Sequence, residues 1–238
     1  MTTRSRHKIV VAKDRAELRR LAAELLARKI HAAVQARGRC SLALSGGSTP
    51  GPVYEELGDS DLAEKIPWSQ LEIYFADERA VPVDHAESNY RLVKETLLRS
   101  HPEVLGQMFR MPADAPDRDQ AARRYARRMP DPLDILVLGM GPDGHTASLF
   151  PGSAALDERE QRVVAVTAPK PPAERMTITP PVLERARAIV VIASGAEKAA
   201  MVARALSGAP DPKSVPAQLA RRGTWVLDQA AAGDLAAP

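Results

Sequence analysis

Residues 139–152 of the chain read GMGPDGHTASLFPG, and this stretch is the most informative about the fold. It follows an apolar run at residues 133–138, which is typical of a buried strand. Glycines and a proline then break the strand, and His145 lies in the loop with Asp143 two residues before it. Open α/β sheets bind ligands in such loops, at the carboxyl ends of parallel strands. A loop histidine is also well suited to move protons near pH 7, although spacing alone fits an ordinary turn with a solvated histidine equally well.

The rest of the chain alternates between strand and helix patterns. Asp14 and Glu17 form a capping-box pattern before a helix that ends at Gly38. Further helices are predicted from residue 52, over 88–98, over 117–128, from 180 and over 196–206. Apolar strands are predicted at 41–44, 71–75, 133–138, 188–193 and 224–227, and strands with one exposed face at 163–167 and 176–179. This alternation predicts an α/β fold, a doubly wound, mostly parallel sheet with helices on both faces, in one domain over residues 1–238.

The composition fits a globular protein with an ordinary core. Of the 238 residues, 45% are hydrophobic and 26% are charged, so the chain can bury a substantial core. Cys40 is the only cysteine, which excludes an internal disulfide, and no cluster of cysteine and histidine suggests a metal site. Because Cys40 opens an apolar strand, we expect a buried structural thiol.

The charge pattern is only mildly basic, with a net charge of +3. Four arginines, Arg123, Arg124, Arg127 and Arg128, share one predicted helix, which we interpret as a solvated face because runs of charge on a helix usually are one and no recognised nucleic-acid-binding module is present. We therefore expect no nucleic-acid partner. The polar, basic N-terminus does not resemble a signal peptide, and no apolar stretch approaches the ~20 residues that span a bilayer. No membrane contact and a cytoplasmic location are expected.

Residues 45–50 read SGGSTP and have the composition of a phosphate-binding loop. They lie between a strand and a helix, where Gly46 and Gly47 let backbone N–H groups approach an anion and the helix N-terminus adds a favourable dipole. Ser48 and Thr49 add hydroxyl donors. The loop lacks the Gly-Lys-Ser/Thr ending of a Walker A motif, and an ordinary strand-to-helix turn remains an alternative.

Other polar side chains also follow predicted strands. Asp77-Glu78-Arg79 comes directly after one strand, where Arg79 is suited to clamp a phosphate and Asp77 to bind sugar hydroxyls or orient a neighbour. Lys198 lies in the first turn of a predicted helix and opposes the helix dipole, which is less costly if an anion binds there. Each of these is also compatible with a solvated surface charge, as is Arg175.

Taken together, these segments resemble the 6-phosphogluconolactonase family. The match is carried by residues 45–50, 77–79 with 88–89, 139–152, 175–179 and Lys198, in order over nearly the whole chain. The resemblance implies a modified Rossmann-like fold shared with glucosamine-6-phosphate deaminases and ribose-5-phosphate isomerases. It also implies hydrolysis of 6-phospho-D-glucono-1,5-lactone to 6-phospho-D-gluconate, a step of the oxidative pentose phosphate pathway.

Two alternatives remain beside the lactonase. The deaminases are similar at residues 45–50, 77–78 and 143–145, but they carry a glutamate where this chain has Phe150 and usually an aromatic residue at Arg79. Phe150 cannot transfer a proton, which disfavours the deaminase. A catalytically silent sugar-phosphate sensor is disfavoured because His145 is present and too few residues precede the first helix for a DNA-binding module.

The resemblance also assigns roles to individual residues. His145 takes a proton from the attacking water and Asp143 orients it, while backbone N–H groups of the glycine-rich loop serve the oxyanion. No metal and no organic cofactor are expected. The partner is a sugar phosphate lactone, and the chain is expected to be a monomer or a small homo-oligomer. The residues expected to bind the substrate and its phosphate are Ser45, Gly46, Gly47, Ser48, Thr49, Asp77, Arg79, Asn89, Arg175 and Lys198.

Overall fold

The computed structural model describes residues 8–235. Its strands are β1 (Lys8–Ala12), β2 (Cys40–Leu44), β3 (Leu71–Phe75), β4 (Asp77–Arg79), β5 (Ile135–Gly139), β6 (Val163–Thr167), β7 (Glu174–Ile178), β8 (Ala188–Ala193) and β9 (Thr224–Asp228). Its α-helices are α1 (Arg15–Arg37), α2 (Pro50–Asp59), α3 (Asn89–Glu95), α4 (Arg118–Arg128), α5 (Pro180–Arg185), α6 (Ala199–Ser207) and α7 (Gln229–Ala232). Short 3₁₀ turns occur at Ala63–Lys65, Trp68–Gln70, Pro102–Gln107, Ala154–Leu156, Ala196–Lys198 and Pro216–Ala220.

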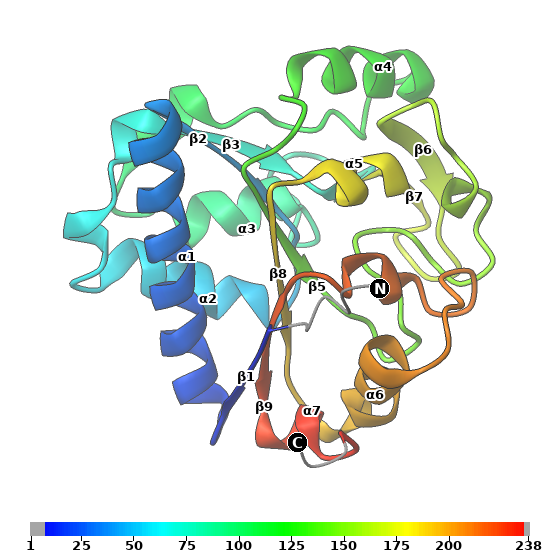
Figure 1. Cartoon of the computed structure of the whole chain (residues 1–238). Helices are drawn as coiled ribbons and strands as arrows, with labels where there is room; N and C mark the ends of the chain where they lie inside the picture. Colours follow the sequence, from blue (N-terminus) through cyan, green and yellow to red (C-terminus); the bar gives the residue numbers. More distant parts are fainter. Residues whose placement is uncertain (1–7, 236–238) are drawn as a thin grey trace.

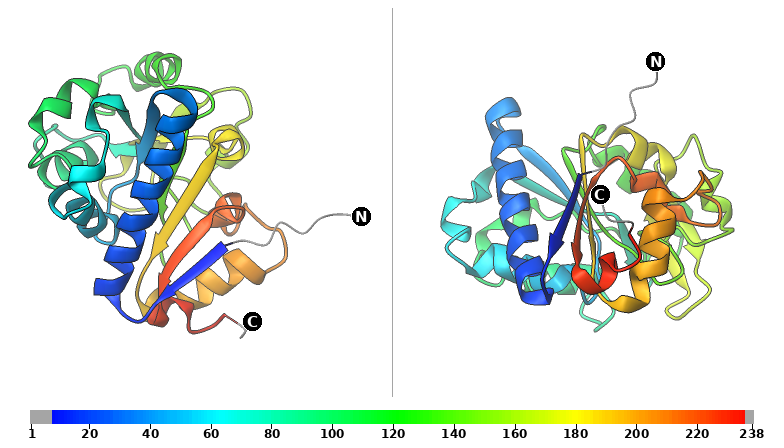
Figure 2. Two further views of the ribbon diagram at one scale, coloured as in Figure 1. Left: turned by 60° about the vertical axis from the view of Figure 1, so that its left-hand side comes forward. Right: turned by 60° about the horizontal axis from the view of Figure 1, so that its bottom comes forward.

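The main sheet has six strands in the order β1-β9-β8-β5-β2-β3, and every neighbouring pair is parallel. Helices α1 and α2 lie on one face and α5 and α6 on the other (Figure 1), and the two further views show the same layers (Figure 2). The predicted doubly wound parallel sheet is thus confirmed. Strand β3 pairs with one edge of β2, and the later strand β5 pairs with the opposite edge of β2. The direction in which strands are added to the sheet therefore reverses between β2 and β5.

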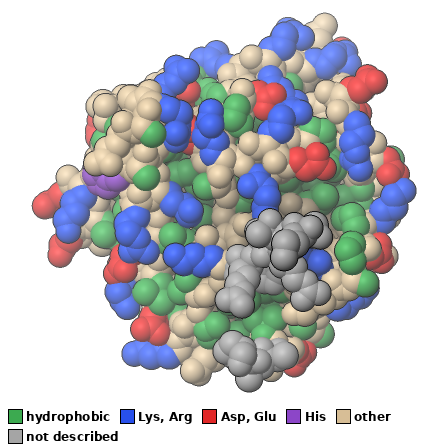
Figure 3. All heavy atoms as spheres, in the orientation of Figure 1, with side chains coloured by type: hydrophobic (Ala, Val, Ile, Leu, Met, Phe, Trp, Pro, Cys, Tyr) green, Lys and Arg blue, Asp and Glu red, His purple; other side chains and the backbone are tan. Residues whose placement is uncertain are grey.

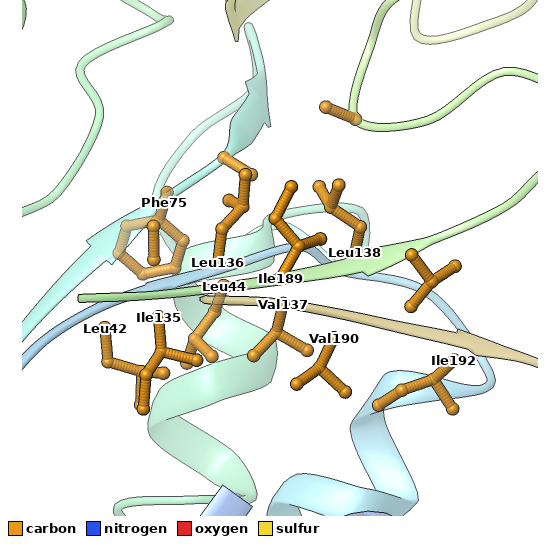
Figure 4. Close-up of a cluster of buried hydrophobic side chains, with 14 of the residues drawn as sticks. Leu42, Leu44, Phe75, Ile135, Leu136, Val137, Leu138, Ile189, Val190 and Ile192 are labelled. Atoms are coloured by element: carbon orange, nitrogen blue, oxygen red, sulfur yellow. The ribbon is translucent and has the colours of Figure 1, made fainter. Parts of the chain in front are cut away.

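Both faces of the central strands are buried, which explains their continuous apolar sequence. Alternate side chains point in opposite directions: Leu136, Leu138 and Ile189 lie on one face, and Val137 and Val190 on the other (Figure 4). All five are at most 2% exposed. Cys40 is fully buried at the start of β2, as expected, and burial raises the pKa of its thiol to about 12.

The first helix begins and ends as its sequence predicts. The Asp14 carboxylate accepts a hydrogen bond from the Glu17 backbone N–H at 2.8 Å, and the Glu17 carboxylate accepts one from the Lys13 N–H at 2.8 Å. Gly38 ends the helix with a φ of 74°, a left-handed conformation that glycine adopts without strain.

A second, three-stranded sheet has the order β4-β7-β6 and is antiparallel. Two expectations are corrected here. Residues 77–79 are strand β4 rather than a loop after a strand, since they pair with β7. Strand β7 has no exposed face, because Arg175, Met176, Thr177 and Ile178 are each at most 3% exposed. Its polar side faces the ligand pocket described below.

Smaller differences concern element ends. Strand β1 was not predicted; it is a short edge strand on which Ile9 and Val11 are exposed, so no buried apolar run marks it. Helix α3 begins after Ser88, as expected, but ends at Glu95 rather than residue 98. The helix predicted over 196–206 is divided into the 3₁₀ turn Ala196–Lys198 and α6. The expectation about the basic N-terminus falls on residues 1–7, which lie outside the described residues.

Helix α4 carries the predicted arginine cluster on its outer side. Arg123, Arg124, Arg127 and Arg128 are all exposed, and basic side chains line the upper edge of the molecule over α4 in Figure 3. In the part of the chain that the structure describes, no helix is long and apolar enough to cross a membrane.

Candidate active site

A pocket opens at the carboxyl ends of β2 and β5, where the strand order of the main sheet reverses. Parallel sheets bind ligands at this reversal because the two loops that follow such strands diverge to opposite faces and leave a crevice. The cavity has a volume of about 180 Å³. It is lined by Ser45, Gly46, Gly47, Ser48, Thr49, Pro50, Asp77, Arg79, Asn89, Gly139, Met140, Gly141, Pro142, His145, Ala147, Lys170, Arg175, Ile192 and Lys198.

The loop after β2 forms an anion-binding wall of this pocket. Among residues 8–235, the backbone N–H groups of residues 46–49 have no hydrogen-bond acceptor, and they lie just before the N-terminus of α2. The buried Tyr54 hydroxyl donates to the Ser45 carbonyl at 2.7 Å and holds the loop from below. A side chain on Gly46 would overlap the Asn89 amide, and Gly47 has a φ of 114°. The composition of the loop therefore serves close packing and free N–H donors.

The loop after β5 carries the imidazole. His145 Nδ1 is hydrogen-bonded to the Asp143 carboxylate, which also accepts the His145 backbone N–H at 3.2 Å. The Gly141 N–H donates to the His145 carbonyl at 2.9 Å, and a Cβ on Gly141 would overlap the imidazole and the carboxylate. Because Nδ1 is engaged, Nε2 is the ring nitrogen left for the pocket.

The Asp143 carboxylate stays ionised beside this imidazole. Burial alone raises its pKa, but the hydrogen bonds and positive charge of His145, with a smaller contribution from Lys170, lower the pKa to about 2. Asp143 itself does not line the pocket; it lies behind His145. Such a pair fixes the tautomer of the imidazole and stabilises its protonated form.

Phe150 closes the side of His145. Its ring stacks on the imidazole with centroids 4.4 Å apart and planes 28° apart, and it is 4% exposed. Two cations, Lys170 Nζ and the Arg175 guanidinium, lie 5.5 Å from the centroid of the Phe150 ring. The Phe150 ring therefore contacts both the imidazole and the two cations.

Four cations line the pocket: Arg79, Lys170, Arg175 and Lys198. Arg79 and Arg175 are direct partners in the register of β4 and β7, a placement that repels like charges. Burial lowers the pKa of Arg175 and that of Lys198, since both cations lose water without a fully compensating partner. Arg79 donates to the Glu87 carbonyl at 2.5 Å. This concentration of partly desolvated positive charge favours an anionic ligand.

Asp77 is the carboxylate that lines the pocket, and it is held by neighbours. It accepts hydrogen bonds from the Ser148 hydroxyl at 2.6 Å and from Asn89 Nδ2 at 3.3 Å. Asn89 Oδ1 and Ser45 Oγ are buried with no hydrogen-bond partner among the described residues. Glu78 points away from the pocket and accepts the Asn89 N–H at 2.8 Å, so it fixes the start of α3.

The comparisons with known proteins show the family of this chain. Residues 13–227 match the family described as glucosamine-6-phosphate isomerases/6-phosphogluconolactonase. The chain belongs to this family. A 6-phosphogluconolactonase of Rattus norvegicus is 38% identical over 231 residues, which are 91% of this chain and 89% of that protein.

Solved structures of relatives share the fold. The 6-phosphogluconolactonase from Trypanosoma brucei superposes with a TM-score of 0.81 at 31% identity, covering 97% of this chain and 99% of that one. A monomeric glucosamine-6-phosphate deaminase, 22% identical, gives a TM-score of 0.80 over 95% of this chain and 99% of its own, and so shows the fold alone. The expectation that 6-phosphogluconolactonases and glucosamine-6-phosphate deaminases share a fold is thereby confirmed.

The structure brings nearly all the residues expected from the family resemblance into this one pocket. His145 and the ten predicted binding residues line it, and Asp143 supports His145 from behind. Sequence reasoning missed Lys170, which lies in the proline-rich stretch 168–172. It also missed Ser148, which connects Asp77 with Arg175 through hydrogen bonds of 2.6 and 3.4 Å. Over residues 8–235, no three potential metal ligands of the His, Cys, Asp or Glu type cluster together.

Proposed function

We propose that this chain hydrolyses 6-phospho-D-glucono-1,5-lactone to 6-phospho-D-gluconate, the lactonase step of the oxidative pentose phosphate pathway. The observation that carries the proposal is the juxtaposition in one pocket of a carboxylate-supported imidazole and a set of cations beside a glycine-rich loop. The imidazole suits proton transfer, and the cations suit a phosphate on the far end of the same substrate.

The chemistry requires one proton to move out and back. A δ-lactone is an activated ester, so a water molecule can attack C1 directly while His145 Nε2 takes one of its protons. The resulting tetrahedral intermediate collapses by breaking the bond between C1 and the ring oxygen. The imidazolium then returns the proton to that oxygen, which leaves as the C5 hydroxyl. General acid–base catalysis of this kind contributes about 10²–10⁴-fold.

Asp143 prepares His145 for both steps. Its contact with Nδ1 keeps the proton on that nitrogen and the lone pair on Nε2, where the water is activated. Because its pKa is held at about 2, the carboxylate remains anionic when the imidazole becomes positive.

The phosphate occupies the other wall of the pocket. The free N–H groups of residues 46–49, the Ser48 and Thr49 hydroxyls, Arg175 and Lys198 bind it, and Arg79, Asn89 and Asp77 contact the phosphate or the substrate's polar groups. Lys170 joins this set as a further cation. Binding energy from the phosphate holds the lactone carbonyl against His145, so losing these contacts reduces turnover as well as affinity.

The deaminase alternative needs a second acid–base group beside the imidazole. The position is occupied by Phe150, stacked at 4.4 Å, which has no proton to give. The silent sensor is disfavoured because the His145–Asp143 pair is assembled in the pocket. The cytoplasmic location, the single domain and the monomeric or small homo-oligomeric state stay predictions.

The decisive experiment follows hydrolysis of freshly generated 6-phosphogluconolactone, with ammonia release from glucosamine 6-phosphate measured in parallel. Hydrolysis well above the spontaneous rate without ammonia supports the lactonase. Ammonia release without hydrolysis would replace it with the deaminase, and silence in both assays would favour the sensor. Equal rates on phosphorylated and plain gluconolactone would show that residues 46–49 and the cations beside them do not bind the phosphate.

A further inference from the structure

Lys198 enters the pocket from a tight turn that a buried carboxylate holds in place. We propose that Asp228 is a positioning residue for Lys198: it fixes the turn at Gly195 and thereby sets where the ammonium meets the phosphate. The inference deepens the proposed function and rests on the phosphate-binding role that it gives to Lys198. It assigns Asp228 no contact with the substrate, since this side chain does not line the pocket.

The hydrogen bonds of Asp228 converge on the residues just before Lys198. Asp228 ends β9 and is 4% exposed. Its Oδ2 accepts the Ser194 hydroxyl at 2.5 Å, and its two oxygens lie 3.1 and 3.2 Å from the Gly195 N–H. Oδ1 also accepts the Ala231 N–H at 2.8 Å and so begins α7. One carboxylate thus joins the ends of β8 and β9.

The turn needs such support because its backbone conformation is unusual. Gly195 has φ 103° and ψ 144°, a combination that residues with a side chain rarely adopt. Conformations of this kind persist where several surrounding contacts hold the backbone in place. The Lys198 N–H donates to the Gly195 carbonyl at 3.0 Å, so the backbone conformation of Gly195 determines the position of the Lys198 backbone.

Lys198 would not stay in the pocket on its own account. It is the N-cap residue of α6, where a positive charge opposes the helix dipole. Burial disfavours its charged form, Lys170 adds repulsion, and Glu197 and Asp143 partly offset both effects. Without a phosphate, a relaxed turn would let the ammonium move out to water. The Asp228 contacts therefore hold a site that is ready for the anion.

Arg15 extends the support to the first helix. Its Nε donates to the Ser194 hydroxyl at 3.0 Å, while that hydroxyl donates to Asp228. Arg15 begins α1, Ser194 follows β8 and Asp228 ends β9, so three elements fix the turn. While these hydrogen bonds are intact, the turn that carries Lys198 is held in one position.

The test compares Asp228→Asn with a matched control, Asp134→Asn. The amide keeps the shape of Asp228 but loses the negative charge and replaces one acceptor oxygen with a donor. The Ser194 hydroxyl can then no longer donate to that position, and the contacts that remain are uncharged and weaker. Asp134 is 7% exposed and accepts the Ser41 N–H and hydroxyl, both at 2.9 Å, at the opposite end of the sheet. It matches Asp228 in burial and in accepting a serine hydroxyl and a backbone N–H, has ion pairs with Arg37 and Arg187 in addition, and lies away from the pocket.

The expected result separates affinity from general destabilisation. Asp228→Asn raises KM for the phosphorylated lactone and Kd for 6-phosphogluconate by about tenfold, as expected for a weakened charged contact. It leaves kcat/KM for plain gluconolactone within about twofold, because that substrate makes no phosphate contact. Asp134→Asn lowers Tm but leaves both KM and Kd unchanged. Equal effects of the two variants on KM and Kd would overturn the proposal.

A double-mutant cycle gives the sharpest reading. If Asp228 acts through Lys198, Asp228→Asn adds nothing to the Kd of a Lys198→Ala protein, whereas an independent role gives additive losses. If Asp228→Asn does not fold, Ser194→Ala removes one arm of the network and should raise Kd about threefold, within the range for one hydrogen bond; an unchanged Kd would contradict the proposal. Intact 6-phosphogluconate binding without lactone hydrolysis would refute the proposed function alone.

Discussion

The Phe150 ring lies nearly parallel to the His145 imidazole, 28° from it and 4.4 Å away between centroids. With Asp143 on the Nδ1 edge, this contact fixes both the plane and the rotation of the base. Replacing Phe150 with leucine keeps an apolar side chain but removes the flat surface. We expect kcat to fall by about tenfold to a hundredfold with KM little changed, because the base is misplaced and the phosphate wall is not.

A matched control for this prediction is Phe109→Leu. Phe109 is also part of an aromatic cluster, with Tyr74 at 4.9 Å, but it lies outside the pocket. Steady-state kinetics on both variants decides the matter. A Phe150→Leu enzyme with the kcat of Phe109→Leu would show that stacking has no catalytic role.

Removal of the base is expected to cost most of the acceleration. His145→Ala should lower kcat by about 10²–10⁴-fold while the protein stays folded, and Asp143→Asn should lower it less, through the wrong tautomer. His101→Asn is the control, because His101 is half-buried against Trp68 and away from the pocket. Near wild-type turnover in His145→Ala would mean that another group activates the water.

The Asp143 carboxylate predicts a specific acid dependence of stability. Its pKa falls from 3.8 to about 2 in the folded state, so the contribution of its ionised form is complete above pH 3.8 and is lost as the pH falls towards 2. The difference in unfolding free energy between wild type and Asp143→Asn should therefore shrink as the pH falls from about 4 towards 2. Urea titrations across this range measure it; a difference that grows on acidification would have the wrong sign.

Lys198 is predicted to stabilise the complex at the expense of the empty protein. Because burial lowers the pKa of its ammonium, Lys198→Met should raise Tm in phosphate-free buffer while weakening 6-phosphogluconate binding by about tenfold or more. Lys213→Met is the control, since Lys213 is exposed and paired with Asp157 at 2.9 Å. Calorimetry gives both quantities, and a lowered Tm for Lys198→Met would show that the lysine has a structural role instead.

The sequence was most informative where burial is complete on both faces. Residues 135–138 and 188–193 are unbroken apolar runs because helices cover both sides of β5 and β8, and such runs predict parallel strands well. The glycines at 46, 47 and 141 were informative for the same reason, since close packing and unusual φ values leave few other choices. These features placed the main sheet and two walls of the pocket.

The parts that escaped prediction depend on contacts distant in the chain. Asp77-Glu78-Arg79 is a strand only because β7 pairs with it, and three charged residues carry no strand signal of their own. Arg175 and Thr177 alternate with apolar residues as on an exposed face, yet they are buried against the pocket. Lys170 was missed because a lone lysine among prolines is usually solvated, and only the folded loop brings it to Phe150.

The direct opposition of Arg79 and Arg175 in the register of β4 and β7 makes the stability of the folded chain depend on an anionic ligand. Two cationic residues at one register position repel each other, and an anion bound beside them would offset that repulsion. A phosphorylated sugar that binds there would stabilise the folded chain by an amount that grows with the logarithm of its concentration above Kd.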